Sequence, residues 1–211
     1  MTQALQIISL IIAYLIGSIP SAVWIGKIFY GIDVREYGSG NAGATNTFRV
    51  LGKKAGVPVL FIDILKGFAA VQLPYLTELV PGSVQFVNLQ LVLGVAALFG
   101  HIFPLFAAFK GGKGIATLLG IILAVHPYAA LVSIGVFLVV FLVSKYVSLG
   151  SITAALTFPI IVIVVFKTRI PSLVIFSMVI AVLVLITHQK NIERLIKREE
   201  SKSPLIKRKT S

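Results

Sequence analysis

Long apolar segments constrain this chain most. A helix crosses a hydrocarbon core of about 30 Å with roughly 17–25 apolar residues. Hydrophobic residues make up 57% of the 211 residues and charged residues 12%, which is too apolar for a soluble domain of this length. The sequence therefore predicts an all-α integral membrane protein. Five segments have the length of a span and few charges, near residues 4–26, 55–76, 87–107, 150–166 and 171–187.

A further apolar region, residues 115–144, is too long for one upright span. At 1.5 Å per residue it would form a helix of about 45 Å. Pro127 falls near its middle, where proline removes a helical hydrogen bond. We therefore expect two short spans that meet at His126 and Pro127.

The basic residues predict the orientation in the membrane. Cytoplasmic loops carry an excess of Lys and Arg. With a break at Pro127, one face carries only Lys167 and Arg169. A single span at 115–144 would instead move Lys145 and the basic tail to that face. We therefore predict seven transmembrane helices in a single domain over 1–211, with the N-terminus outside and a basic cytoplasmic tail from about 196–211. The other face collects Lys27, Arg35, Arg49, Lys53, Lys54, Lys110, Lys113, Lys145 and the tail.

The first motif, "GSGNAGATN" at 38–46, combines three glycines with hydroxyl and amide side chains. Glycine lets backbone N–H groups turn toward one point, which forms an anion-binding nest. Ser39 and Asn41 add side-chain donors, and Arg49 follows as a bidentate phosphate ligand. The motif therefore favours a phosphate site. A flexible loop with helix-packing glycines is the alternative.

The second motif, "FKGGKGIAT" at 109–117, places Lys113 among glycines where a helix is expected to begin. N–H groups at a helix start favour an anion, and a lysine adds a point charge. A Walker A loop is disfavoured, because position 107 is Ala where that motif requires glycine. The alternative is that Lys110 and Lys113 only enforce topology.

Polar residues within or beside the spans are further candidates. His101 in "GHIFP" is either a functional intramembrane group or a structural hydrogen-bond partner. Asp63 and Lys66 lie three residues apart, and we expect them to pair with each other. His188 and Asn191 lie one helical turn apart and can face the same inner cavity, unless their helix is simply solvated at the interface.

These segments resemble the bacterial acyl-phosphate-dependent glycerol-3-phosphate acyltransferases, small multispanning enzymes that begin phospholipid synthesis. The resemblance covers nearly the whole chain and rests on several separated motifs in the family's order. They are "GSIPSAVWIGK" (17–27), "REYGSGNAGATN" (35–46), "GHIFPLFAAFKGGKGIAT" (100–117) and "HQKNIERL" (188–195).

The resemblance implies a seven-span fold in the bacterial cytoplasmic membrane, with the active site facing the cytoplasm. It implies transfer of a fatty acyl group from acyl phosphate to the 1-hydroxyl of glycerol 3-phosphate, giving lysophosphatidate and phosphate without a cofactor or metal. His188 and Asn191 are the candidates for catalysis, and Arg198 stands where the family usually has glycine. The implied substrate-binding residues are Ser39, Arg49, Lys113, Ser151, His188, Asn191 and Glu200.

Acyl phosphate has a good leaving group, so the enzyme mainly has to hold two anionic phosphates together and aim a hydroxyl. We expect a substrate phosphate oxygen to take the proton. A His followed five residues later by Asp, as in other acyltransferases, is disfavoured, because Phe106, Leu131 and Glu193 occupy those positions. Expected partners are both substrates, membrane lipid and the enzyme that makes acyl phosphate.

Two other classes compete with an enzyme. A transporter for small phosphorylated anions would place polar groups near the bilayer midplane, whereas these motifs gather at one edge. A lipid-binding scaffold explains the basic tail but not the two glycine-and-lysine motifs. Nucleic acid is the least favoured anionic partner, because the chain is built from apolar spans.

Overall fold

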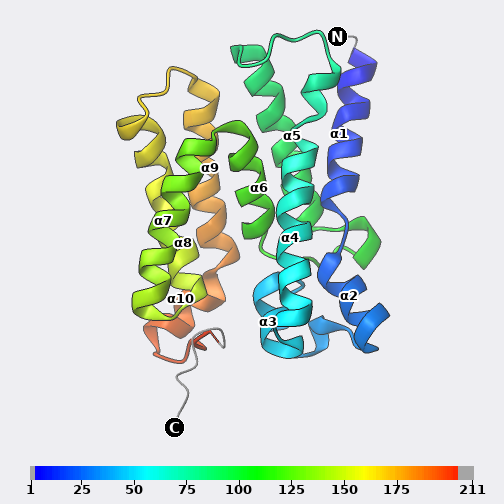
Figure 1. Cartoon of the computed structure of the whole chain (residues 1–211), viewed down its shortest axis with the longest axis vertical. Helices are drawn as coiled ribbons and strands as arrows, with labels where there is room; N and C mark the ends of the chain where they lie inside the picture. The colour runs from blue at the N-terminus through cyan, green and yellow to red at the C-terminus, as the bar shows by residue number, and fades with distance from the viewer. Residues whose placement is uncertain (1–2, 204–211) are drawn as a thin grey trace. The chain divides into compact units, whose positions relative to one another are not determined.

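The computed structural model describes residues 3–203, which form helices joined by turns, with no strand among them. The chain divides into two compact units, which we call the N-terminal unit (Met1–Pro127) and the C-terminal unit (Tyr128–Ser211). Figure 1 shows the helices of each unit running roughly side by side. The basic tail predicted from residue 196 lies partly outside the described residues.

Six α-helices build the N-terminal unit: α1 (Gln3–Gly17), α2 (Ser21–Tyr30), α3 (Ala44–Leu51), α4 (Lys53–Ala70), α5 (Val84–Ile102) and α6 (Ile115–Val125). Short 3-10 helices cover Val34–Glu36, Leu73–Leu76 and Leu105–Ala107. From the boundary at Pro127 follow α7 (Pro127–Ser144), α8 (Val147–Ile160), a π-helical turn (Ile161–Val165), α9 (Pro171–Thr187) and α10 (Gln189–Ile196).

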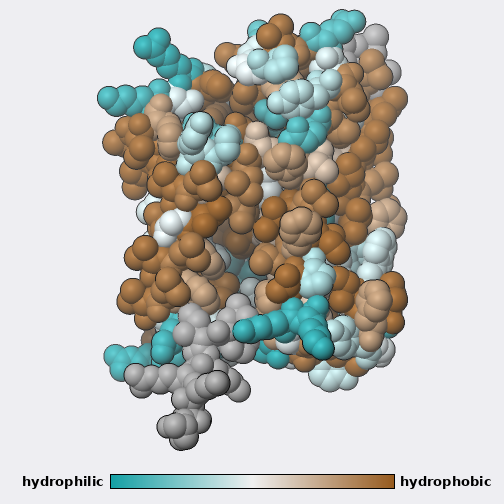
Figure 2. Space-filling view, in the orientation of Figure 1, coloured by the Kyte–Doolittle hydropathy of each residue, from teal (hydrophilic) through white to brown (hydrophobic). Residues whose placement is uncertain are grey.

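The prediction of an all-α membrane protein is confirmed. Within the described residues, four helical segments are long and apolar enough to cross a membrane: Lys53–Leu76, Val84–Ala107, Pro127–Ser144 and Val147–Val165. The count rises to six if two bent pairs each form one span, α1 with α2 and α9 with α10. The remaining apolar helix, α6, has 11 residues. In Figure 2 apolar side chains cover the middle of the visible helices and polar ones lie toward their ends. The count of seven spans and the orientation stay predictions.

The break expected at His126 is confirmed, because α6 ends at Val125 and α7 begins at Pro127. The span predicted near 4–26 is not one straight helix, because α1 ends at Gly17, α2 begins at Ser21, and the two are bent by 41°. Pro20 lacks an N–H group and pushes the residue before it out of helical conformation.

Glycine allows close helix packing in the N-terminal unit. A methyl group added at Gly67 of α4 would meet the carbonyl oxygen of Thr117, and one at Gly120 of α6 would meet the carbonyl oxygen of Ile64. Membrane helices associate through small residues that bring backbones together, since apolar burial gives no preference over lipid. These glycines therefore fix α4 against α6.

The predicted pair of Asp63 and Lys66 is confirmed, with 2.9 Å between Lys66 Nζ and Asp63 Oδ1. The pair also binds polar groups at the break between α1 and α2. Lys66 Nζ donates to the carbonyl oxygen of Ile19 at 2.8 Å, and Ser21 Oγ donates to Asp63 Oδ1 at 2.8 Å. A backbone carbonyl freed inside a membrane must find a donor, and Lys66 provides one. The charged pair on α4 thus holds the broken first helix.

Candidate functional site

The first glycine loop, residues 38–43, is braced by Asn46 of α3. Asn46 Oδ1 accepts hydrogen bonds from Ser39 N at 2.8 Å and Ser39 Oγ at 3.1 Å. Asn46 Nδ2 donates to the carbonyl oxygens of Val34 at 2.8 Å and Tyr37 at 3.1 Å. Asn46 is buried, and a methyl group at Gly38 would meet its Oδ1. The loop is therefore a fixed structure rather than a flexible linker.

The predicted anion-binding nest offers fewer backbone N–H groups to an anion than the sequence indicates. The N–H groups of Ser39 and Gly40 have acceptors within this region, Asn46 Oδ1 and the Tyr37 carbonyl. The start of α3 also offers N–H groups to an anion, because the N-cap residue Gly43 provides no side-chain cap. Ser39 is exposed and Asn41 is half-buried beside this start, and Arg49 is half-buried in the last turn of α3.

The second glycine loop, residues 110–114, lies on the C-terminal end of α5. Gly111 N donates to the Ile102 carbonyl and Gly112 N to the His101 carbonyl, both at 3.2 Å. A methyl group at Gly112 would meet His101 Nε2. As expected, a helix begins directly after the loop, with Gly114 as N-cap and no side-chain cap. Lys113 is half-buried in this loop.

The structure brings the two glycine loops together. A methyl group at Gly112 would lie 3.3 Å from the carbonyl oxygen of Ala42. Val23, Ala42 and Ala107 form a small buried cluster beneath them. Two helix starts without side-chain caps, those of α3 and α6, therefore follow loops that touch each other. Sequence reasoning identified each loop but not their contact.

A charged bridge also joins the segment before the first loop to the second loop, and sequence reasoning missed it. Arg35 donates to both carboxylate oxygens of Asp33, and its Nη1 donates to the carbonyl oxygens of Ala107 and Lys110. The Arg35 hydrogen bond holds the pKa of Asp33 well below its usual range, and Asp33 in turn raises the pKa of Arg35. The sequence alone indicates Arg35 only as a topology signal. The Asp33-x-Arg35 spacing beside the first motif was the available clue.

His101 lies under the second glycine loop. It is buried, and its Nδ1 is 3.0 Å from Thr117 Oγ1 and 3.7 Å from Asp63 Oδ1. These contacts link α5 to α4 and α6. The geometry fits the structural role that we considered for His101.

In the C-terminal unit, Glu200 gathers three partners. Its Oε1 accepts from Ser148 Oγ and Asn191 Nδ2, both at 2.7 Å, and its Oε2 accepts from Arg194 Nε at 2.8 Å. Burial acts to raise the pKa of Glu200, but the hydrogen bonds from Arg194, Ser148 and Asn191 outweigh it and leave this pKa below its usual value. Glu200 is therefore a carboxylate, and it holds the Asn191 amide in place through this hydrogen bond.

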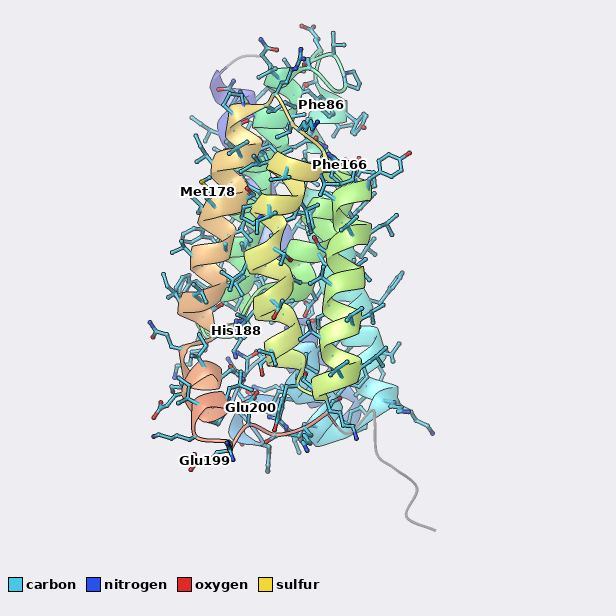
Figure 3. The ribbon with its side chains drawn as sticks, turned by 90° about the vertical axis from the view of Figure 1, so that its left-hand side faces the viewer. Phe86, Phe166, Met178, His188, Glu199 and Glu200 are labelled. Atoms are coloured by element: carbon cyan, nitrogen blue, oxygen red, sulfur yellow. The ribbon has the colours of Figure 1, made fainter. Side chains whose placement is uncertain are left out.

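His188 and Ser151 are also buried in this unit. His188 Nδ1 lies 2.9 Å from the Val184 carbonyl oxygen. A carbonyl can only accept, so Nδ1 of His188 carries a proton. Ser151 Oγ donates to the Val147 carbonyl at 2.9 Å, which leaves its oxygen as an acceptor. Figure 3 shows His188 and Glu200 at the same end of this unit.

Sequence reasoning missed Ser148 and Arg194 as partners of Glu200. Ser148 lies three residues before Ser151 on α8, so both face one side of that helix. Arg194 lies three residues after Asn191 on α10. This spacing along each helix could have indicated that Ser148 and Arg194 lie beside the predicted site residues. The predicted residues thus form two groups: Ser39, Asn41, Arg49 and Lys113 in the N-terminal unit, and Ser151, His188, Asn191 and Glu200 in the C-terminal unit.

Comparison with known proteins gives consistent matches. A family model described as "Glycerol-3-phosphate acyltransferase" matches residues 7–198. A protein of that name from Listeria monocytogenes serovar 1/2a is 48% identical over 202 residues, covering 96% of this chain and 98% of the relative. One from Fusobacterium nucleatum is 46% identical over 193 residues, covering 92% and 95%.

Two crystal structures are similar along most of the chain. Both are of PlsY, described as an integral membrane glycerol 3-phosphate acyltransferase. The glycerol 3-phosphate form is 39% identical with a TM-score of 0.84, covering 93% of this chain and 94% of that one. The lysophosphatidic acid form is 37% identical with a TM-score of 0.80 and the same coverage.

Proposed function

Since this chain belongs to the glycerol-3-phosphate acyltransferase family, we propose that it transfers a fatty acyl group from acyl phosphate to the 1-hydroxyl of glycerol 3-phosphate. The products are 1-acylglycerol 3-phosphate and inorganic phosphate. The chain is a multi-pass membrane acyltransferase of phospholipid synthesis. Family membership thus favours the enzyme over the transporter and the lipid-binding scaffold.

The contact between the two glycine loops is the observation that carries the proposal. It brings together two helix starts without side-chain caps, and the loops and α3 also carry Lys113 and Arg49. Each start offers N–H groups to an anion, and each cation screens a phosphate. Two anionic substrates have to approach each other in this reaction. Two neighbouring anion-binding elements can hold the two anionic groups and screen the repulsion between them.

In the proposed reaction the 1-hydroxyl oxygen attacks the acyl carbonyl carbon. The bond between that carbon and the phosphate oxygen breaks, and the phosphate leaves with the electron pair. The hydroxyl proton passes to a phosphate oxygen, so no side chain has to act as a strong base. Ser39 and Asn41 are proposed to hold a substrate phosphate. In the C-terminal unit, His188, Asn191 and Ser151 are proposed to bind a phosphate or hydroxyl group of a substrate, with Glu200 holding Asn191.

A direct assay tests the proposal. Purified protein in detergent should convert glycerol 3-phosphate and acyl phosphate to lysophosphatidate and release one phosphate per acyl transfer. Acyl-CoA in place of acyl phosphate should give no product. If folded protein makes product only from acyl-CoA, the donor is wrong. If it makes none from either donor, the reaction is wrong.

We further propose seven spans in the bacterial cytoplasmic membrane, with the site facing the cytoplasm and the whole chain acting as one domain. The apolar helix α6 and the two bent pairs bring the total to seven when each counts as a span. The chain contains no cysteine, so single cysteines can be labelled without background. Cysteine at Glu78 should react with an impermeant reagent added outside, and cysteine at Lys202 should not. The reverse labelling pattern would show that the chain has the opposite orientation in the membrane.

A further inference from the structure

The Arg35 side chain joins two segments that are far apart in sequence. Its Nε and Nη2 donate to Asp33 Oδ1 and Oδ2 at 2.9 and 2.7 Å. Its Nη1 donates to the carbonyl oxygens of Ala107 at 2.8 Å and Lys110 at 3.3 Å. These bonds occupy four of the five N–H groups that a guanidinium carries. Arg35 is therefore committed to the protein and is a poor candidate for direct substrate contact.

The turn that Arg35 holds has an uncommon backbone. Ala108 and Phe109 adopt φ angles of 53° and 58°, in the left-handed region that side chains other than glycine rarely adopt. The two carbonyl groups bound by Arg35, those of Ala107 and Lys110, stand on either side of this pair. Such a conformation persists only where surrounding contacts enforce it. Arg35, which lies just before the first glycine loop, supplies two of those contacts.

Lys110 begins the second glycine loop, three residues before Lys113. Asp33 directs the Arg35 guanidinium through a bidentate pair whose planar geometry a lysine cannot reproduce. We propose that Arg35 is a positioning residue that fixes the second glycine loop, and with it Lys113, against the first glycine loop. This inference rests on the proposed function of Lys113 in phosphate binding.

The test compares Arg35→Gln and Arg35→Lys with Lys27→Gln. Lys27 makes a matched control, because its Nζ lies 3.3 Å from the same Asp33 carboxylate on a side chain that is 57% exposed. Both Arg35 variants should raise KM for glycerol 3-phosphate and lower kcat/KM by about 10- to 100-fold, the usual result of a small misplacement. Lys27→Gln should change kcat/KM by less than about two-fold, as expected for a pair whose lysine is exposed to solvent.

Two further measurements separate positioning from other roles. In a Lys113→Ala background, Arg35→Gln should add less than about three-fold, because the group that it positions is gone. Hydrogen exchange should rise at the amides of Phe109, Gly111 and Gly112 in the Arg35 variants and stay unchanged in Lys27→Gln. The hydrogen-exchange measurement does not depend on catalytic activity. Asp33→Asn, which keeps Arg35, should give a smaller change in the same direction if Arg35→Gln folds poorly.

Several outcomes would overturn the inference. Near-normal kinetics of Arg35→Lys would show that charge alone suffices. An equal loss from Arg35→Gln with and without Lys113 would place its effect elsewhere. Unchanged exchange in residues 104–114 would show that Arg35 does not hold the turn. Absence of product from wild-type protein would instead refute the proposed function, and the exchange data would still decide whether Arg35 holds the loop.

Discussion

Lys66 Nζ lies 2.9 Å from Asp63 Oδ1 inside the apolar helix α4, and only 4% of the Lys66 side chain and 1% of the Asp63 side chain are exposed. The same two groups bind the Ile19 carbonyl and the Ser21 hydroxyl at the break between α1 and α2. A buried ion pair is stable only when its remaining hydrogen bonds are provided. The break in the first helix therefore depends on a charge pair that is about 45 residues away in sequence.

Removing both members of this pair should cost less than the sum of removing each one alone. Asp63→Asn or Lys66→Met alone should lower stability by about 3–5 kcal/mol, because the partner is left charged and buried. The double variant should lose clearly less than the sum of the two. Thermal unfolding of the four proteins in one detergent gives the comparison.

The exposed pair Glu193 and Lys197, at 2.6 Å, is the control for this cycle. Glu193→Gln and Lys197→Met should act additively and change the melting temperature little, since solvent screens an exposed pair. Additive losses at Asp63 and Lys66 would contradict the coupling inferred from the structure.

Asn46 should be essential for the shape of the first glycine loop. Asn46→Ala removes the acceptor of the Ser39 amide and the donor to the Val34 and Tyr37 carbonyls. Each buried polar group left unpaired costs about 1–3 kcal/mol. We expect a lower melting temperature and a lower kcat/KM. Exposed Thr45→Ala is the control for stability and should melt like wild type.

Arg49 and Lys113 should matter for turnover rather than for folding. Arg49→Ala and Lys113→Ala should each lower kcat/KM by about 10- to 100-fold, since a hydrogen bond to a charged group contributes about 1.5–3 kcal/mol. Lys53→Ala and Lys54→Ala remove exposed positive charges at the start of α4 and should leave kinetics nearly unchanged. Normal kinetics of both Arg49 and Lys113 variants, with folding intact, would refute the phosphate-binding role.

Arg198→Gly should stabilise the protein. Arg198 has a φ of 59°, and Glu199 N donates back to the Arg194 carbonyl at 2.7 Å, so α10 ends in a left-handed cap where glycine fits best. The resemblance noted above expects glycine at this position. The gain should be about 1 kcal/mol, the usual left-handed penalty of a side chain. Arg198→Ala removes the charge but keeps the strain, and should not raise the melting temperature.

Acidification should weaken the cluster around Glu200. Its pKa in the folded protein lies below the ordinary value of 4.5. A lowered pKa contributes stability that is present above that ordinary value and lost as pH falls through the folded pKa. The melting temperature of wild type should therefore fall below pH 4.5 more steeply than that of Glu200→Gln. Parallel curves for the two proteins would contradict the assignment.

Local sequence predicted much of the fold, because span length and proline breaks are read from neighbouring residues. The break at His126, the helix start after Gly114 and the pairing of Asp63 with Lys66 are each set by spacings of a few residues. The break within the first predicted span has a tertiary cause. Its apolar pattern continues through 18–20, but α4 supplies polar partners that make a break there tolerable.

The sequence by itself determined that this chain is a helical membrane protein, that two glycine motifs stand before helices, and which family it resembles. Only the tertiary structure decided that Asn46 holds the first loop, that the two loops touch, and that Arg35 binds carbonyl groups of the second loop and the turn before it. Such contacts depend on side chains that meet across separate elements. Neither periodicity nor motif spacing encodes a contact between residues about 70 positions apart, whereas the packing of helices brings them within hydrogen-bond distance.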